Sequence, residues 1–291
     1  MGPIEALLRD HEVTDVLVNG PDQVWVERGG VLERSEAVFS GPSAVLAAVE
    51  RVIAPLGLRL DRSSPFVDAR LEDGSRLHAV IPPASVDGPV VAVRRFTQAV
   101  AGLDQLVPAG SATGEQVSCL RGLVVGRRNV LVSGGTGAGK TTLLNLLAGE
   151  IPPHERVVTI EDAAELSLPG HVVRLEAHPA NADGGGAVEI RSLLRSALRL
   201  RPDRIVVGEV RGAEALDMVW ALNTGHLGSL STIHANSPAE ALWRLETLAL
   251  SDGGMAGEAI RRQIEAGIHA VVQVERTPGG RRVAAIVERS P

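Results

Sequence analysis

Short segments in which hydrophobic and polar residues alternate dominate the first third of the chain. They predict strands, separated by turns, at residues 16–18, 24–27, 31–35, 66–71, 76–81 and 90–96. Between the third and fourth strands, Val45, Val49 and Ile53 fall on one face of a predicted helix. Residues 1–96 therefore predict a small α+β domain.

The pattern changes after residue 113, where apolar runs begin to alternate with helical segments. The predicted strands cover residues 130–132, 157–160, 172–175, 205–207, 229–233, 270–274 and 282–287. The predicted helices begin near residue 140 and cover residues 190–200, 213–223, 238–250 and 255–266. This alternation is typical of a mainly parallel sheet, so we expect an α/β domain at residues 114–291. Residues 97–113, rich in small residues, are the predicted linker.

The segment that joins the strand at 130–132 to the next helix matches G-x-x-x-x-G-K-[ST], the pattern of a P-loop. Triphosphate oxygens must approach several backbone N–H groups at a helix start, which favours residues without a Cβ. We therefore predict that ATP binds here. The predicted phosphate-binding residues are Gly134, Gly135, Thr136, Gly137, Ala138, Gly139, Lys140, Thr141 and Thr142.

Lys140 and Thr141 have separate expected roles in this motif. The lysine would reach the β- and γ-phosphates, and the threonine hydroxyl would help to hold Mg²⁺. Lys140 is the single lysine among 29 basic residues, all the others being arginines. Because a planar guanidinium cannot replace a compact ammonium under a phosphate, this favours phosphate binding over a simple glycine-rich turn.

The composition restricts the possible functions. A net charge of −6 and an aromatic content of 2% argue against a broad nucleic-acid surface, so we expect no nucleic-acid partner. Cys119 is the only cysteine, which excludes an intramolecular disulfide. No apolar run approaches the roughly 18 residues of a membrane span. We therefore expect a cytoplasmic protein that reaches membranes only through partners.

Polar residues directly follow three of the predicted strands. Ligands of a parallel sheet bind at the carboxyl ends of its strands. Hydrolysis of ATP needs a carboxylate that orients water, a holder for Mg²⁺ and a polar contact to the γ-phosphate. The candidate catalytic residues at these strand ends are Glu161, Asp162, Glu165, Glu209 and His234.

The strand at 205–207 resembles a Walker B strand, but Gly208 stands where the metal-holding Asp is usual. We therefore expect Glu209 to act through Mg²⁺-bound water, so the predicted metal ligands are Thr141 and Glu209. A carboxylate after a strand is also common as a helix cap or turn residue. A lone histidine such as His234 is more often a hydrogen-bonded structural residue.

Seven segments of the chain resemble the secretion ATPases of type II and type IV secretion and pilus systems, and most closely the tight-adherence (Tad/Flp) pilus assembly ATPases. They are SPFVDARLEDGSRLHAVIPP from residue 64, AVRRF from 92, GGTGAGKTT from 134, TIEDAAEL from 159, RLRPDRIVVGEVRGAEALDM from 199, NTGHLGSLSTIHANSP from 223 and QVER from 273. The resemblance covers nearly the whole chain, and its Asp-box, Walker B and His-box segments follow the family's order.

The resemblance implies a PAS-like first domain and a RecA-like P-loop ATPase domain in a homohexamer. In that family the Asp-box positions the attacking water, which implies this role for Glu165, with Glu161 and Asp162 nearby. The Walker B and His-box segments match Glu209 and His234. Arginines of the first domain reach the phosphates, and the matching residues are Arg76, Arg94 and Arg95.

The resemblance also implies a function and partners. The chain would power assembly of a Tad or type IV-like pilus, or of a related secretion apparatus, and would act peripherally on an inner-membrane platform protein. A conjugative type IV secretion ATPase is an alternative. A small-molecule kinase would need an acceptor pocket and lid, whereas the first third of this chain is β-rich and ends in arginines. A non-catalytic scaffold would need a damaged site, whereas every candidate catalytic residue is present.

Overall fold

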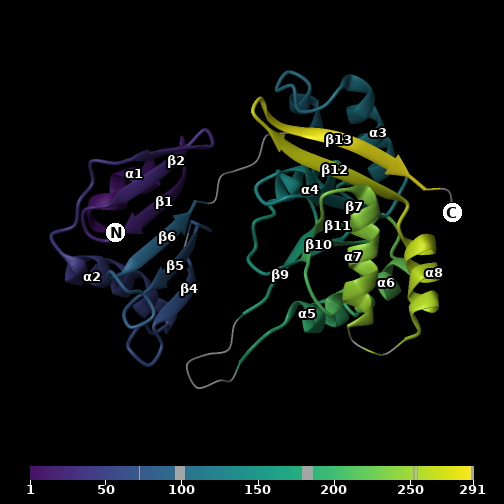
Figure 1. Ribbon diagram of the computed structural model, residues 1–291. Helices are drawn as coiled ribbons and strands as arrows, with labels where there is room; N and C mark the ends of the chain where they lie inside the picture. Colours follow the sequence, from purple (N-terminus) through teal and green to yellow (C-terminus); the bar gives the residue numbers. More distant parts are fainter. Residues whose placement is uncertain (72, 96–101, 179–185, 252, 254, 290–291) are drawn as a thin grey trace. The chain divides into compact units, whose positions relative to one another are not determined.

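A computed structural model describes residues 1–71, 73–95, 102–178, 186–251, 253 and 255–289 (Figure 1). The chain separates into two compact units, the first made mainly of residues 1–98 and the second mainly of residues 99–291. Buried apolar clusters form separately in each unit. Within the described residues, no helix is both long enough and apolar enough to cross a membrane.

The first unit is an antiparallel sheet with one long helix. Its strands are β1 Val13–Asn19, β2 Val24–Arg28, β3 Val31–Arg34, β4 Phe66–Arg70, β5 Arg76–Val80 and β6 Val90–Arg94, in the order β3-β2-β1-β6-β5-β4. The helical elements are η1 Gly2–Ile4, α1 Glu5–Arg9, α2 Pro42–Ile53 and η2 Ala54–Leu56. Each strand and the long helix predicted for this region are present, with ends displaced by up to three residues.

The core of this unit forms where α2 meets the sheet. Val45, Val49 and Ile53 share one face of α2 and are buried. Val16 and Val18 of β1 alternate with less buried neighbours and belong to the same apolar cluster. A helix period of 3.6 and a strand period of 2 therefore direct both sets of side chains into one core.

The second unit is a seven-stranded sheet. Its strands are β7 Val130–Gly134, β8 Val157–Glu161, β9 Val172–Glu176, β10 Arg204–Val210, β11 Leu230–His234, β12 Ala270–Thr277 and β13 Gly280–Glu288. Their order is β13-β12-β7-β11-β10-β8-β9, and only β13 runs antiparallel to its neighbour. The predicted α/β fold with a mainly parallel sheet is confirmed.

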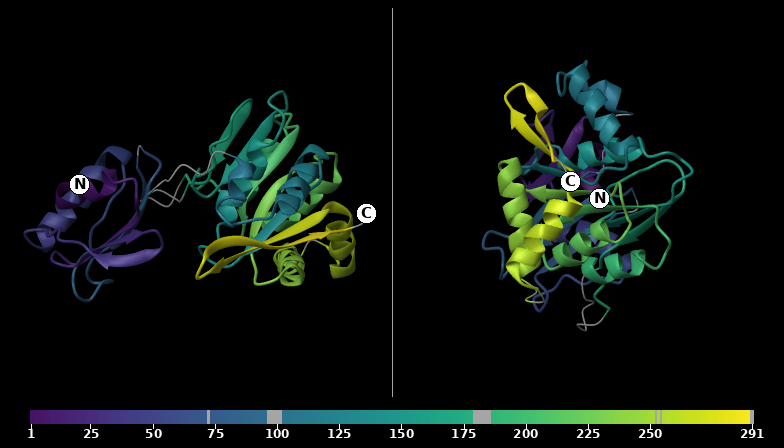
Figure 2. Two further views of the ribbon diagram at one scale, coloured as in Figure 1. Left: turned by 90° about the horizontal axis from the view of Figure 1, so that it is seen from above. Right: turned by 90° about the vertical axis from the view of Figure 1, so that its right-hand side faces the viewer.

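Helices cover both faces of this sheet (Figure 2). They are η3 Leu103–Leu106, α3 Gly114–Val125, α4 Lys140–Gly149, α5 Ile190–Ala197, α6 Glu214–Asn223, α7 Pro238–Leu250 and α8 Gly257–Gly267. In β7, Leu131 enters a core shared with α5 to α8, whereas Val130 and Val132 enter a core shared with α3 and α4. A strand buried on both faces explains the unbroken apolar run in the sequence.

The second half of the predicted linker packs against the second unit. Residues 96–101 lie outside the described part of the chain, but Leu103 is fully buried and Leu106 packs against the same core. Thr113 then forms a capping box with Gln116 at the start of α3, a helix that the sequence analysis did not predict. The C-terminal part of the predicted linker therefore contributes apolar side chains to the core of the second unit.

A buried ion pair joins distant parts of the second unit at the start of β10. Arg204 is completely buried, and its Nε and Nη2 donate to the Glu155 carboxylate at 2.8 and 2.9 Å. Its Nη1 donates to the Val124 carbonyl of α3 at 2.7 Å. Gly228 has φ +83°, and a Cβ there would lie 2.4 Å from Arg204 Nη1. The hydrogen bonds from Arg204 lower the pKa of Glu155.

We expect Arg204→Met to lower the free energy of unfolding by about 3–5 kcal/mol, because it leaves a buried carboxylate without its main partner. The control is Arg262→Met in α8, whose partner Glu258 is as exposed as the arginine itself. That change should have almost no effect, since exposed ion pairs contribute little. Urea unfolding followed by circular dichroism would measure both, and equal losses would contradict a special role for Arg204.

Candidate nucleotide site

Four neighbouring strands bring the candidate residues to one edge of the second sheet. β7, β11, β10 and β8 are adjacent, and each leads into one of the predicted polar segments (Figure 1). Because these strands are parallel, their carboxyl ends meet at the same edge. The register also places His234 of β11 beside Gly134 of β7. The P-loop, the His-box, Walker B and the Asp-box therefore face a common region.

The P-loop between β7 and α4 uses backbone conformations that favour glycine. Gly137 and Gly139 have φ values of +69° and +96°. Gly134 meets a steric limit instead, because a Cβ there would lie 2.5 Å from the Val274 carbonyl oxygen of β12. α4 begins at Lys140, so its unsatisfied N–H groups adjoin the loop. This cradle fits a triphosphate.

The other predicted phosphate-binding residues lie in the same loop and first helical turn. Thr136 is exposed and Ala138 is buried, and those of intermediate exposure are Gly135, Thr141 and Thr142. Thr141 lies in the first turn of α4, directly after Lys140.

Lys140 lies among charged groups. Its Nζ donates to the Gly135 carbonyl at 3.1 Å and lies 3.9 Å from Glu209 Oε1. Burial lowers the pKa of this ammonium; Glu209 opposes the shift, whereas Arg211 and Arg244 reinforce it. A bound polyanion would favour the charged form again. Lys140 is therefore influenced by one carboxylate and two guanidinium groups.

Glu161, the last residue of β8, occupies the space beside Gly208 of β10. A Cβ at Gly208 would lie 2.9 Å from Glu161 Cγ. The two strands are neighbours, so this contact is fixed by their register. The glycine at the usual Asp position of Walker B is therefore a packing requirement, and a carboxylate from the adjacent strand fills the space beside it.

The Glu161 carboxyl shapes the Asp-box turn. Its Oε1 accepts hydrogen bonds from the backbone N–H groups of Glu165 and Leu166, both at 2.9 Å. Its Oε2 is buried and has no hydrogen-bond partner among the described residues. Burial raises the pKa of Glu161 to about 7, although the two N–H groups act in the opposite direction. This carboxyl therefore changes charge near neutral pH.

Walker B and the Asp-box are linked through an arginine. Glu209 lies where the register between β10 and β11 shifts, and such irregularities redirect side chains. Its Oε2 accepts a hydrogen bond from Arg211 Nε at 2.7 Å. Arg211 Nη1 lies 3.3 Å from Asp162 Oδ2. One guanidinium therefore contacts a carboxylate from each segment.

A buried polar chain connects the His-box loop to the strand before the P-loop. His234 ends β11, and the carbonyl of the next residue, Ala235, accepts from Gln273 Nε2 at 3.3 Å. Gln273 Oε1 in turn accepts from the Ser133 hydroxyl. Ser133 and Gln273 are both buried, so these bonds satisfy polar groups that water does not reach.

The family follows from the whole chain as well as from this edge. Residues 1–277 match the family described as type II/IV secretion system protein. The chain belongs to this family.

Relatives and a solved structure show how far the similarity extends. A putative conjugal transfer protein of Mycobacterium tuberculosis is 44% identical over 288 residues, covering 97% of this chain and 82% of the relative. The conjugal transfer protein TrbB of Rhizobium radiobacter is 34% identical over 288 residues, covering 96% and 84%. The crystal structure of the VirB11 ATPase from the Brucella suis type IV secretion system has a TM-score of 0.54 at 30% identity, covering 98% and 95%.

The three arginines predicted to reach the phosphates, Arg76, Arg94 and Arg95, belong to the first unit. Arg76 and Arg94 pair across β5 and β6, and Arg94 Nε donates to Asp15 Oδ1 at 3.0 Å. Arg95 Nη1 donates to the Val13 carbonyl at 2.9 Å and also to the Asp10 carbonyl. Arg95 therefore stabilises its own unit, whereas Arg94 is exposed on the sheet.

Sequence reasoning missed several cations near the site. Arg211 was detectable, because it stands two positions after Glu209 in the same segment. Arg174 of β9 donates to the Ala164 carbonyl of the Asp-box at 3.1 Å. Arg244 of α7 acts on the charge of Lys140. The last two come from separate elements, so no local motif marks them.

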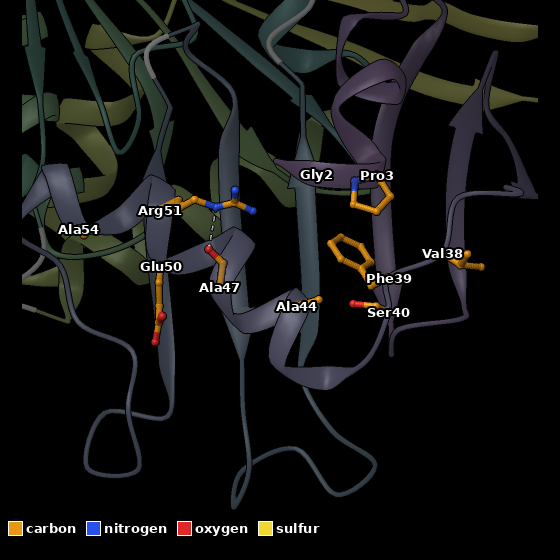
Figure 3. A pocket seen from close by; sticks show the side chains of 10 residues that line it. All are labelled: Gly2, Pro3, Val38, Phe39, Ser40, Ala44, Ala47, Glu50, Arg51 and Ala54. Atoms are coloured by element: carbon orange, nitrogen blue, oxygen red, sulfur yellow. Dashed lines mark hydrogen bonds between the residues drawn. The ribbon is translucent and has the colours of Figure 1, made fainter.

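A groove in the first unit is not part of this site. It has a volume of about 860 Å³ and lies between η1, residues 38–40 and α2 (Figure 3). Its walls are mostly apolar, and Arg51, one of its charged residues, donates to the Ala47 carbonyl within α2 at 3.1 Å. None of the predicted site residues lines it.

The raised pKa of Glu161 predicts a pH dependence of stability. A carboxyl whose folded pKa, about 7, exceeds its unfolded value, about 4.5, contributes stability that is present below pH 4.5 and is lost as pH rises through 7. Relative to Glu161→Gln, the wild type should lose about 3 kcal/mol over this interval. Unfolding both proteins without nucleotide from pH 4.5 to 8 tests this. A constant difference would place the Glu161 pKa near its ordinary value.

Proposed function

We propose that this chain is an ATP-hydrolysing motor of a type IV secretion system that resembles those of conjugal transfer. The family membership and the similarity to the VirB11 ATPase support an ATPase. The observation that carries the proposal is the edge at which a complete P-loop, Glu209, the Asp-box and His234 meet. Phosphoryl transfer to water needs positioned charges more than covalent chemistry, and this edge supplies them.

Lys140 and the loop glycines hold the phosphates in this proposal. The N–H groups of the loop and of the first turn of α4 receive the anionic oxygens, and Lys140 moves from the Gly135 carbonyl to the β- and γ-phosphates. Thr141 and Glu209 would hold Mg²⁺, which when bound neutralises phosphate charge. Among the described residues, no group of three His, Cys, Asp or Glu side chains could hold a metal, so nucleotide oxygens and water would complete its coordination.

Glu165 is the proposed residue that orients the attacking water. Glu161 is less suited to this role, because its Oε1 is occupied by two backbone N–H groups and its side chain is 3% exposed. We assign Glu161 to positioning the turn that presents Glu165. The Arg211 guanidinium contacts both Glu209 and Asp162. The γ-phosphate would compete with these two carboxylates for the guanidinium. His234, beside Gly134, is the proposed polar contact to the γ-phosphate.

The first unit is proposed to complete the site within a homohexamer at an inner-membrane platform protein, with the chain peripheral to the membrane. Its six-stranded antiparallel sheet, in which α2 follows β3 and precedes β4, supports a PAS-like domain. The parallel sheet with the P-loop after β7 supports a RecA-like domain in the second unit. Arg94 is the best placed of the three arginines to reach a phosphate, because it is exposed, whereas Arg95 is held by backbone carbonyls.

The relatives favour conjugative type IV secretion over the Tad pilus reading of the sequence. Two of them are named for conjugal transfer, and a third, PtlH of Bordetella pertussis, is named as a type IV secretion system protein and is 34% identical over 306 residues. Pilus assembly is the second candidate, and the segments that resemble the Tad pilus ATPases support it. Both candidates use the same hydrolytic site and differ in cargo.

We expect Lys140→Ala to lower ATP turnover by at least about 10²-fold, because it removes a preorganised charge from the transferring phosphoryl group. Its melting temperature should stay close to that of the wild type, since Lys140, the first residue of α4, is not part of the apolar core. Phosphate release and thermal melting measure the two effects. Turnover equal to wild type would remove the P-loop from the mechanism.

Arg94→Ala should lower kcat by about 10³-fold if this arginine reaches the phosphates of a neighbouring subunit. The control is Arg51→Ala, an exposed arginine of the same unit in α2, which should leave turnover unchanged. Specific activity of the wild type should also rise with protein concentration, because the site would be complete only in the ring. Concentration-independent turnover by a species that sediments as a monomer would refute the assembly.

A further inference from the structure

The hairpin of β12 and β13 covers the outside of the P-loop. Arg281 of β13 donates through Nε to the Gly137 carbonyl at 3.1 Å. Its stem lies against the next glycine of the loop, because a Cβ at Gly139 would be 3.1 Å from Arg281 Cδ. A Cβ at Gly137 would similarly lie 3.7 Å from Arg276 Nη1 of β12. Two arginines therefore approach the loop from a strand pair at the edge of the sheet (Figure 1).

The bond from Arg281 leaves the phosphate-binding groups of the loop available. Phosphates are bound by backbone N–H groups, whereas Arg281 uses a carbonyl oxygen. Glycines lose more conformational freedom on ordering than other residues, so a loop with left-handed Gly137 and Gly139 has a large entropy to lose. An external contact that holds the loop before the ligand arrives reduces that loss on binding.

The hairpin itself does not require this arginine. Arg281 stands directly opposite Arg276 in the antiparallel pairing, and like charges at such positions destabilise a strand pair. The next residue, Arg282, instead forms an ion pair with Glu275 within the hairpin. Arg282 thus stabilises the hairpin through its ion pair. Arg281 instead faces another arginine across the hairpin and donates to the P-loop.

We propose that Arg281 is a positioning residue that holds the P-loop in its nucleotide-binding conformation. This inference rests on the proposed nucleotide site and adds a residue to it. Because Arg281 acts on the loop and not on one phosphate, it should support ADP and ATP equally. Its loss should therefore appear in Kd and KM and not selectively in the hydrolytic step.

The test compares Arg281→Met, which keeps an apolar stem over Gly139 but lacks the donor, with Arg282→Met as the matched control. Calorimetry with Mg²⁺ would give Kd for ADP and for a non-hydrolysable ATP analogue. Arg281→Met should raise both values by the same factor, about 3- to 10-fold, as for one lost hydrogen bond. Arg281→Lys should recover part of the loss. Arg282→Met should change neither Kd, although it should lower the melting temperature more than Arg281→Met does.

Three outcomes would overturn the proposal. Unchanged Kd values for Arg281→Met would show that the loop needs no external support. An effect limited to the ATP analogue or to kcat would make Arg281 a γ-phosphate contact. Equal effects of the two methionine variants would assign both to hairpin stability. If the wild type binds neither nucleotide, the proposed function itself fails. If the wild type and Arg281→Met bind equally well and Lys140→Ala does not bind, the nucleotide site is supported and only the role of Arg281 is refuted.

Discussion

The parallel register of β7 with its two neighbours is the constraint on which the site depends. β7 pairs with β11 on one side and β12 on the other, so Gly134 lies beside both His234 and Val274. The close approach of Val274 excludes any side chain at Gly134. The start of the P-loop, the His-box and the hairpin that carries Arg281 are therefore fixed by one set of backbone hydrogen bonds. A shift of one residue would move every one of them to a different neighbour.

Lys140 and Arg211, at this edge of the sheet, each contact an acidic side chain of the protein. Glu209 lies between Lys140 and Arg211, and Arg211 also contacts Asp162. In the proposed mechanism, Lys140 and Arg211 would turn from these carboxylates to phosphate oxygens, and Glu209 would turn to Mg²⁺. Glu161 differs, because it is buried beside Gly208 and its charge is opposed by desolvation. Partly exposed groups therefore suit contact with ligand, whereas the buried carboxyl suits the shaping of the turn.

Buried polar groups join neighbouring strands and helices of the second unit. Arg204 joins β10, Glu155 and the end of α3 within the core, and the Ser133–Gln273 pair joins β7 to β12. Each group is buried and hydrogen-bonded, which avoids the cost of isolated polar atoms. Because these bonds connect elements distant in the sequence, they define which strands are neighbours more strictly than apolar packing alone.

The sequence by itself determined the elements and the local chemistry. Strands such as β7 and helices such as α7 follow from apolar periodicity, and the P-loop follows from residue types that phosphate binding requires within eight positions. α3 was missed although Thr113 and Gln116 form a capping box, so a usable local signal was present. The tertiary structure alone shows that Glu161 fills the space beside Gly208 and that its carboxyl is buried. It also brings Arg174, Arg244, Gln273 and Arg281 to the site. These facts depend on contacts between strands and helices far apart in the chain, and periodicity reports the face of an element but not its neighbour.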